Sequence, residues 1–245
     1  NLWQDIRNKA EKKPAPTMLH HDLDIVQRIL RDQLADSFKA IWIDNEEHYE
    51  SVLRFVERFQ PALVGKVKLY TREAPIFDAF GVTNELEKAL RPKVCLKSGG
   101  FIVINQTEAL VAIDVNSGRV KEKDIEETAR TTNIEAAQEI ARQMMLRDMG
   151  GLIVIDFIDM EEHRNNRAVE RRMKDALKND RARIQVGHIS HFGLLEMSRQ
   201  RMRTGVLEGS TVVCSHCAGS GMVRSTASVA LHVLRVLEDA LIKSA

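Results

Sequence analysis

The sequence predicts an α/β protein with two parts, because strand-like and helix-like runs alternate in two separate stretches. In the first stretch, the apolar runs IWI at 41–43 and VKLY at 67–70 flank a helical segment at 46–59, which is the order of a βαβ unit. In the second, FIVIN at 101–105 and ALVAIDV at 109–115 are separated by a short polar link, which is typical of an antiparallel hairpin. With 245 residues and 44% hydrophobic content, the chain is long enough for a core in each part.

Helical segments precede the first strand. Residues 1–13 are predicted to be a helix that Pro14 and Pro16 end, because proline lacks an N–H group and its ring opposes helix continuation. A second helix is expected over 22–36. The chain up to about residue 90 is therefore predicted to be a small α/β subdomain, and the second part is expected to begin near Pro92.

The second part continues with a long helix and an apolar strand. The segment 125–148 carries apolar residues at helical spacing, and Gly150 and Gly151 end it. The run GLIVIDF at 151–157 shows almost no alternation, which is typical of a strand buried on both faces. The remaining expected elements are a helix at 161–180, a strand at 183–187, a cysteine-containing loop at 214–221 and a helix at 225–243.

Composition excludes membrane-spanning and disulfide-rich classes. The net charge is +1, the longest apolar run is too short to span a bilayer, and the first residues lack the apolar segment of a secretory signal. The three cysteines do not suggest a disulfide framework, so a cytoplasmic protein is expected. Because the first residue is Asn rather than Met, we expect the sequence to be a piece of a longer protein.

One segment is strongly basic. Residues 164–203 contain eleven Lys or Arg against four Asp or Glu, a balance of +7. Such a bias suits a phosphate-bearing partner. A solvated helix face explains the same charges about equally well, so charge alone leaves both interpretations open.

Two aspartates lie in apolar strand-like runs. An ionised carboxylate at Asp114 or Asp156 loses hydration there unless a cation or strong donors replace the water. A bound Mg²⁺ would replace it and would activate a water molecule, while Asn116 projects to the same side as Asp114 and is placed to assist. Structural ion pairs or turn caps produce the same pattern, so this alternative stays open. Asp159 is interpreted as a cap for a helix starting near Glu161.

The run VVCSHCAGSGMV predicts half of a zinc site. Cys214 and Cys217 lie on a tight turn, and the freedom of Gly219 and Gly221 at positive φ lets backbone amides fold around thiolate sulfurs. Cys-x-x-Cys followed by two glycines is a fairly specific pattern, although two ordinary reduced cysteines remain the alternative.

A closed structural zinc site needs four ligands, so further ligands must come from elsewhere. His188, His191 and His232 remain candidates, although nothing in their spacing selects them, and His216 is expected to point outward. A second copy of the chain is the more economical source. Cys95 lies in a strand-like context and is interpreted as a buried small hydrophobic residue.

Several long motifs occur in order along the chain. They are SGGFIVINQTEALVAIDVNSGR at 98–119, IEETARTTNIEAAQEIARQMMLRDMGGLIVIDFIDM at 125–160, DRARIQVGHISHFGLLEMSRQR at 180–201 and CSHCAGSG at 214–221. These motifs closely resemble the ribonuclease E/G family, and LLEMSRQR and DFIDM favour its ribonuclease E branch. Upstream, EKKPAPTMLHHDLDIVQRILRD and VKLYT resemble it as well, so the likeness covers essentially the whole chain.

The resemblance implies an activity and site residues. It implies a Mg²⁺-dependent endoribonuclease for single-stranded, A/U-rich RNA, with Asp114 and Asp156 binding the catalytic ion and Asn116 assisting at the scissile phosphate. It implies that Cys214 and Cys217 supply half of a four-cysteine zinc link in a homodimer, and that dimers pair in the intact protein. Arg183 matches a family arginine near the pocket for the 5′ end of RNA.

The resemblance also implies a division of the chain and a cellular setting. Expected are the end of a 5′-sensing region and a linker, a ribonuclease H-like subdomain, a deoxyribonuclease I-like catalytic subdomain, the zinc link and a final helix. The setting is the bacterial cytoplasm, with degradosome partners and peripheral inner-membrane association assigned to regions outside this sequence. The link 119–124 is short beside family members. The divisions fall at 1–25, 26–90, 91–212, 213–222 and 223–245.

Two rival functions remain at the level of sequence. The first is a zinc-linked RNA-binding or assembly module without activity. The second is a nuclease directed at DNA, which the deoxyribonuclease I-like part alone would suggest, although fold is poor evidence for substrate.

Overall fold

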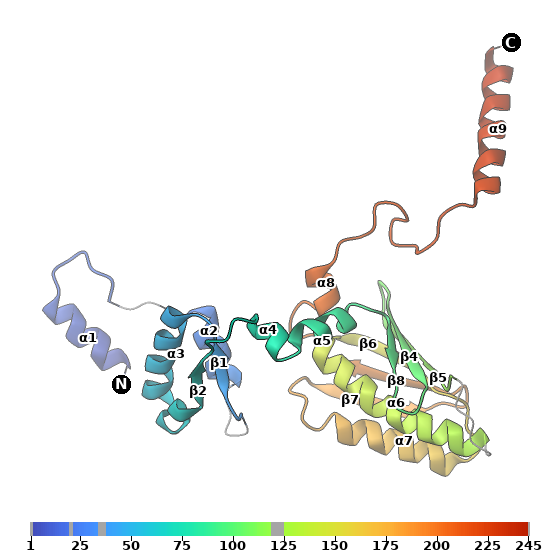
Figure 1. Cartoon of the computed structure of the whole chain (residues 1–245). Helices are drawn as coiled ribbons and strands as arrows, with labels where there is room; N and C mark the ends of the chain where they lie inside the picture. The colour runs from blue at the N-terminus through green and yellow to red at the C-terminus, as the bar shows by residue number, and fades with distance from the viewer. Residues whose placement is uncertain (1, 20–21, 34–37, 119–124, 245) are drawn as a thin grey trace. The chain divides into compact units, whose positions relative to one another are not determined.

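The computed structural model describes residues 2–19, 22–33, 38–118 and 125–244, and it forms two compact units, Asn1–Thr83 and Asn84–Ala245 (Figure 1). Each unit has its own hydrophobic core cluster, and the mixed α/β class predicted from the sequence is confirmed. The link 119–124 and the end of the helix predicted over 22–36 lie outside the described residues.

The first unit contains the predicted βαβ unit. Strands β1 (Ile41–Ile43) and β2 (Val67–Leu69) pair in parallel, and helix α3 (Glu46–Phe59) connects them. The side chain of Asn45 accepts a hydrogen bond from the amide of His48 and so caps this helix. The unit also contains helices α1 (Leu2–Lys12), α2 (Ile25–Gln33) and α4 (Ile76–Ala79) and a 3₁₀ helix at Pro61–Lys66.

The two units divide between Thr83 and Asn84, earlier than the boundary at residue 90 expected from the sequence. Helix α5 (Val82–Ala89) explains the difference, because most of it belongs with the second unit. Its carboxylate Glu85 lies 3.3 Å from the guanidinium of Arg142, and the guanidinium of Arg147 donates to the carbonyl of Arg91 at 2.9 Å. Pro92 directly precedes strand β3 (Lys93–Cys95).

The second unit is built on a six-stranded sheet in the order β3-β4-β5-β6-β8-β7. The predicted hairpin of β4 and β5 is confirmed, β5 and β6 are parallel, and all other neighbours are antiparallel. The strands are β3 (Lys93–Cys95), β4 (Phe101–Gln106), β5 (Val111–Asn116), β6 (Gly151–Asp156), β7 (Ile184–Ile189) and β8 (Leu194–Arg199).

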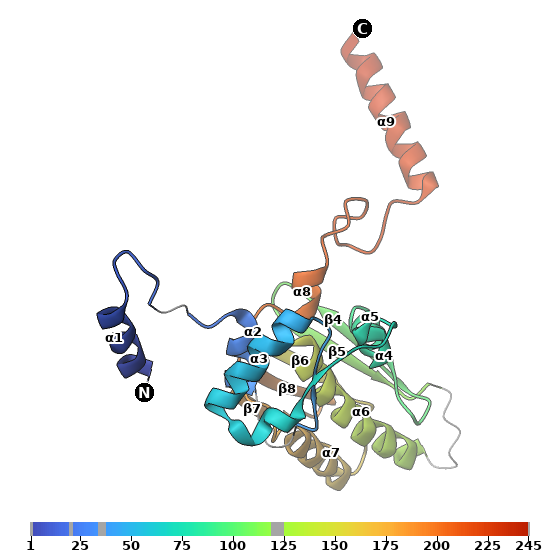
Figure 2. The same cartoon turned by 60° about the vertical axis from the view of Figure 1, so that its left-hand side comes forward.

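Helices α6 (Ile125–Arg147) and α7 (His163–Ala176) lie side by side on one face of this sheet (Figures 1 and 2). Their apolar sides pack on the inward residues of the strands and form a core. Fully buried members include Ile102, Ile113, Ile140, Met144, Ile153, Ile155 and Leu195.

The prediction that β6 is buried on both faces was wrong. Ile153 and Ile155 are buried under the helices, but Leu152 on the opposite face is 48% exposed and Asp156 is exposed too. The reason is that helices α6 and α7 cover one face of the sheet. The other face of β6 also carries apolar residues but is not covered by these helices. We call the opposite side the open face.

Strand β8 was missed, because Arg199 hides the alternation of LLEMSR. This arginine is 5% exposed and points into the covered side, where its guanidinium lies 2.7 Å from Asp180 and 3.0 Å from Asp148. A charged residue in a strand normally predicts an outward-facing position, but Arg199 faces inward. Gly193, at φ 77°, forms the turn that joins β7 to β8.

The C-terminal region consists of helix α8 (Val206–Ser210), an extended loop with the cysteines, and helix α9 (Thr226–Ser244). The helices predicted after the long strand are confirmed as α7 and α9. Among the described residues, no helix combines the length and apolarity needed to cross a membrane.

Candidate catalytic carboxylates and cysteine knuckle

The sheet brings Asp114 and Asp156 together. They are direct partners in the parallel register of β5 and β6, and both side chains are exposed on the open face. Neighbouring strands lie about 4.8 Å apart, so the two carboxylates leave the sheet side by side. The core beneath them, with Ile113 and Ile155 fully buried, fixes the register, because a slip of one residue would bury both aspartates.

The two carboxylates oppose each other's ionisation. Burial raises the pKa of Asp156 above its ordinary value, and the nearby charges of Asp114 and Asp159 raise it further. Two like-charged carboxylates on neighbouring strands are an arrangement that a bound cation would stabilise. The pair is therefore electrostatically unfavourable by itself and suited to a positively charged ligand.

Asn116 belongs to the same cluster, as the sequence predicts. Its amide nitrogen donates to Oδ2 of Asp114 at 2.7 Å, and it stands directly opposite Phe101 on β4. The bond holds one oxygen of Asp114 in place, and the amide oxygen of Asn116 takes no part in it. Asn116 is therefore a positioning partner of the carboxylate.

Sequence reasoning missed the residue that holds the loop after Asp156. Asn133 on α6 is fully buried, donates to the carbonyl of Ile158 at 2.8 Å and accepts from the amide of Ile158 at 3.1 Å. An asparagine in a helix one turn before Ala137 on the core-facing side was the available indication. The exchange of two bonds fixes the path of the chain directly after the carboxylate.

The interpretation of Asp159 as a helix cap was wrong. Helix α7 begins at His163 with Glu162 as its N-cap residue, and no side-chain cap bond forms there. Instead, the carboxylate of Glu126 on α6 accepts from the amides of Glu161 and Glu162. Asp159 does not cap α7, and its negative charge contributes to the raised pKa of Asp156.

The donors in this cluster suit a hard cation that keeps most of its water. Within the described residues, no group of three or more His, Cys, Asp or Glu side chains forms a complete metal site. Magnesium is commonly held by one or two carboxylates with waters and substrate oxygens completing its shell. The pair Asp114 and Asp156, with the amide of Asn116 beside it, fits that donor set.

Arg183 lies away from the carboxylates. Its carbonyl accepts from the amide of Gln200, just beyond the end of β8 that pairs with Gly151. Asp156 is at the other end of β6, roughly 17 Å along the strand at 3.3 Å per residue. Arg183 is exposed, so the structure places it at a separate edge of the same unit.

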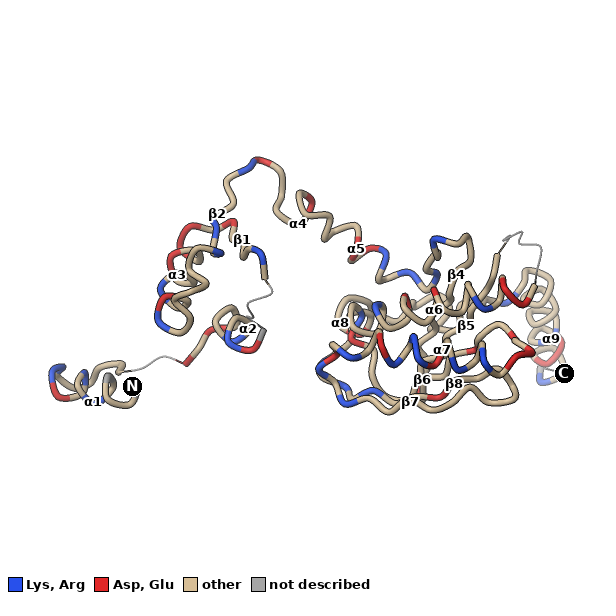
Figure 3. The backbone as a smooth tube through the Cα atoms, turned by 90° about the horizontal axis from the view of Figure 1, so that it is seen from below, with Lys and Arg blue, Asp and Glu red and all other residues tan. Residues whose placement is uncertain are grey.

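Several basic residues of the segment 164–203 form ion pairs with aspartates of the same protein. Arg199 is buried between two aspartates, and Lys178 lies 2.6 Å from Asp175. Helix α7 is itself rich in basic residues, which Figure 3 shows in blue along the backbone. They are Arg164, Arg167, Arg171, Arg172 and Lys174, against Glu170 and Asp175. Part of the apparent charge excess is therefore structural, and the exposed remainder is divided between α7 and the segments that follow it.

The cysteine knuckle forms as predicted. Hydrogen bonds from the amides of Cys217 and His216, and from the Cys217 side chain, lower the pKa of the Cys214 thiol. Gly219 and Gly221 have φ of 85° and 70°, which confirms the positive φ expected of both. A thiolate stabilised by amide donors is the form that binds zinc.

Contacts are described for His188, one of the candidate zinc ligands, and the exposure of Cys95 is described as well. His188 lies 2.9 Å from the nearly buried carboxylate of Glu170, which orients its ring. Cys95 is exposed, so its interpretation as a buried hydrophobic residue was wrong. The cause is its place on edge strand β3, where Val94 turns to the core and Cys95 turns outward.

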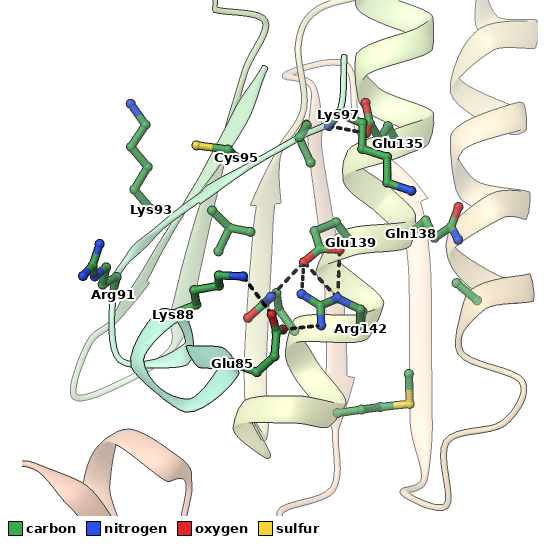
Figure 4. A pocket seen from close by; sticks show the side chains of 15 residues that line it. Glu85, Lys88, Arg91, Lys93, Cys95, Lys97, Glu135, Gln138, Glu139 and Arg142 are labelled. Carbon is green, nitrogen blue, oxygen red and sulfur yellow. Dashed lines mark hydrogen bonds and ion pairs between the residues drawn. The ribbon is translucent and has the colours of Figure 1, made fainter. Parts of the chain in front are cut away.

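A groove of about 920 Å³ lies between β3 and α6 (Figure 4). Internal pairs satisfy its carboxylates: Glu139 binds Arg142, and Glu135 accepts from the amides of Lys97 and Ser98. The groove lies at the β3 edge of the sheet, where Lys93 and Cys95 also line it, whereas the aspartate pair is on the interior strands β5 and β6. The candidate catalytic residues therefore do not line it.

Comparisons with known proteins identify the family of the chain. The profile of the ribonuclease E/G family matches residues 1–202, and a profile described as an RNase E/G thioredoxin-like domain matches residues 213–245. Ribonuclease E of Escherichia coli K12 is 48% identical over 98% of this chain and 23% of its own length. Ribonuclease E of Haemophilus influenzae is 46% identical over 98% of this chain and 26% of its length.

A shorter relative is matched more extensively. Ribonuclease G of Escherichia coli K12 is 37% identical over 96% of this chain and 48% of its own length. The chain thus spans between about a quarter and a half of these relatives. Since one family profile covers most of the chain, the protein belongs to the ribonuclease E/G family.

Proposed function

We propose that this protein is a magnesium-dependent endoribonuclease that hydrolyses single-stranded RNA. The relatives bear the names ribonuclease E and ribonuclease G, which support the reaction class. The observation that carries the proposal is the registered pair Asp114 and Asp156 on the open face, where burial and like charge oppose ionisation of Asp156.

The residues divide the work as follows. Asp114 and Asp156 would hold the magnesium ion, which would supply a bound water of lowered pKa and neutralise charge on the scissile phosphate. Asn116 orients Asp114, and Asn133 holds the chain that follows Asp156. Attack of water on phosphorus with departure of the 3′ oxygen leaves 5′-phosphate and 3′-hydroxyl ends.

The substrate class follows from accessibility and from family membership. An open sheet face admits a flexible backbone that bends over the carboxylates, which suits single-stranded nucleic acid. The preference for A/U-rich sites and the roles in RNA processing, ribosomal RNA maturation and mRNA decay rest on the resemblance. Arg183, at its separate edge, is assigned to contact with RNA near its 5′ end.

Cleavage of a fluorescent single-stranded A/U-rich RNA tests the proposal. With Mg²⁺, we expect Asp114→Asn and Asp156→Asn each to lower the rate by at least about a hundredfold, because loss of a metal ligand removes charge stabilisation in the transition state. Asp175→Asn, which removes an exposed carboxylate on α7, is the matched control. EDTA should abolish cleavage, and added Mg²⁺ should restore it.

Two outcomes would overturn this proposal. RNA cutting that both variants keep at the unmodified rate would show that neither carboxylate is needed. It would favour a zinc-linked RNA-binding or assembly module without activity of its own. Preferential cutting of a DNA oligonucleotide of matched sequence would favour a nuclease directed at DNA.

We further propose that Cys214 and Cys217 form half of a zinc site shared by two subunits. The amide donors around the Cys214 sulfur and the exposure of that thiol support this assembly. Replacing both cysteines with Ser should convert a zinc-containing dimer into a monomer by analytical sedimentation. An unchanged dimer without zinc would contradict the shared site.

The remaining assignments concern subdomains and larger assemblies. We propose that 26–90 is the ribonuclease H-like part and 91–212 the deoxyribonuclease I-like part. Pairing of zinc-linked dimers and contacts with degradosome proteins are assigned to the intact protein. Sedimentation of the intact protein tests the first assembly, since a tetramer is expected.

A further inference from the structure

A lysine lies in the same row of the sheet as the two carboxylates. The register runs from Lys93 on β3 to Val103, then to Asp114 and Asp156. Residues directly opposite each other in a sheet project from the same face. Lys93 therefore belongs to the open face, two strands and about 10 Å from Asp114 at the usual strand spacing.

The side chains around β3 separate into two groups. Lys93 and Cys95 point away from α6, whereas Lys97 lies next to Glu135 of that helix (Figure 4). Val94, between the first two, packs against the core and fixes this orientation. Lys93 on β3 therefore points away from α6, whereas Lys97, just after β3, lies on the α6 side.

The ammonium of Lys93 is held over an aromatic ring. Its Nζ lies 3.7 Å from the centroid of Phe101, on the neighbouring strand β4. Among the described residues, no carboxylate lies within ion-pair distance of Lys93, whereas Lys88 lies 2.9 Å from Glu85. The ring keeps a cation on the open face without neutralising it.

Electrostatics gives this cation a use. Asp114, Asp156 and the nearby Asp159 make the centre of the site negative, so they repel an RNA backbone wherever a metal ion does not intervene. A positive group in the same row, within reach of a neighbouring phosphate, would offset that repulsion. Lys93 is the member of the row with this charge.

We propose that Lys93, supported by Phe101, binds a phosphate of single-stranded RNA next to the one that is cut. The proposal rests on the proposed function, because it assumes that RNA lies over Asp114 and Asp156. Phe101 stands opposite Asn116, so the lysine, its ring and the carboxylate cluster form one continuous surface across β3, β4, β5 and β6. The ligand is thus a flanking phosphodiester on the β3 side.

The salt dependence of RNA binding tests this contact. Asp114→Asn is made in every protein so that RNA is bound without being cut, and a fluorescein-labelled single-stranded RNA is titrated at several NaCl concentrations. For Lys93→Gln, the slope of log affinity against log salt should decrease by about 0.7, the value for one lost phosphate contact on a single strand. Lys97→Gln, on the other side of the sheet, should leave the slope unchanged.

Three results would overturn the proposal. An unchanged slope in Lys93→Gln would make Lys93 a solvated surface lysine. An equal decrease in Lys97→Gln would show diffuse attraction rather than a contact. Phe101→Leu should reduce the slope less than Lys93→Gln does. The third contrary result is a loss of affinity in Phe101→Leu with the slope unchanged, which would assign base stacking to the ring instead of support for the lysine.

The experiments distinguish failure of the Lys93 phosphate contact from failure of the proposed RNA-cleaving function. Cleavage by the protein with Asp114 intact, and its loss on Asp114→Asn, test the carboxylate chemistry without reference to Lys93. If cleavage depends on Asp114 but the slope does not depend on Lys93, only the phosphate contact is rejected.

Discussion

The carboxylate pair and the cysteine pair are built in different ways. Asp114 and Asp156 stand on two paired strands above a buried core, so the fold itself sets their separation. Cys214 and Cys217 lie on a loop between α8 and α9, and the loop organises the sulfurs through its own amides and positive-φ residues. The sheet site is positioned by tertiary packing, whereas the knuckle is positioned locally.

This difference predicts where stability and function are coupled. Substitutions under the sheet should unfold the second unit and disturb the carboxylates with it. Equivalent substitutions in α9, whose apolar residues are exposed, should leave the folding of the sheet unchanged. The following variants test the contrast, from the largest expected effect to the smallest.

Replacing Arg199 should have the largest effect. Arg199→Met leaves Asp180 and Asp148 without their buried partner, so we expect about 3 to 5 kcal/mol lower stability in urea unfolding. Arg235→Met on exposed α9 should change stability by less than about 0.5 kcal/mol. Equal effects of the two variants would contradict the contrast.

The pH dependence of that ion pair has a definite sign. Burial opposes ionisation of Asp180, but hydrogen bonds and charge from Arg199 and the nearby amides outweigh it and lower the pKa of Asp180. A lowered folded-state pKa contributes stability above the unfolded value near 3.9 that is lost as pH falls through the folded pKa. Arg199→Met should therefore weaken the acid sensitivity of unfolding as the pH falls below about 4.

Apolar truncation gives the next largest contrast. Ile140→Ala removes a fully buried side chain between α6 and the sheet and should cost about 2 to 5 kcal/mol. Leu237→Ala on α9, where the leucine is 55% exposed, should cost less than about 0.5 kcal/mol in the monomer. Calorimetry of both variants compares them directly. A large loss from Leu237→Ala in the monomer would show that α9 packs on a core.

The loop after Asp156 links packing to chemistry. Asn133→Leu leaves the amide and carbonyl of Ile158 without their partner, so we expect a loss of about 1 to 3 kcal/mol. Cleavage measured well below the melting temperature should also fall, because the segment after the carboxylate loses its anchor. Unchanged activity with reduced stability would make Asn133 a purely structural residue.

Neutralising Asp156 should have a small effect of opposite sign. Because its folded-state pKa is raised, ionisation of Asp156 costs stability above that pKa, and protonation restores stability as pH falls through it. Asp156→Asn should therefore stabilise the metal-free protein at pH 7 by less than about 1 kcal/mol, since solvent screens the exposed carboxylate. Lower thermal stability of this variant without metal would contradict the like-charge account.

Local patterns predicted much of the fold. The βαβ unit, the β4–β5 hairpin, the long helix α6 and the knuckle follow from periodicity and turn residues close together in the chain. The errors concern tertiary packing, that is, which face of each strand is covered. The exposed face of β6, the inward Arg199 and the outward Cys95 depend on which elements cover each strand, and sequence spacing does not reveal that.

The site shows the same limit. Asp114, Asn116 and Asp156 could be chosen from their apolar surroundings, and the sheet brings them together. Asn133 and Lys93 reach the site only through tertiary contacts, one across the helix-to-loop packing and one along the cross-strand row. Their roles become visible once the register is known.

Binding of a divalent ion tests the central claim most directly. Mn²⁺, a paramagnetic substitute for Mg²⁺, is titrated into the protein and followed by electron paramagnetic resonance, with Asp114→Asn, Asp156→Asn and the control Asp175→Asn measured alongside. The account predicts a site in the unmodified protein and in Asp175→Asn that is lost or weakened at least about tenfold when either carboxylate of the pair is removed. Equal Mn²⁺ binding by all four proteins would contradict it.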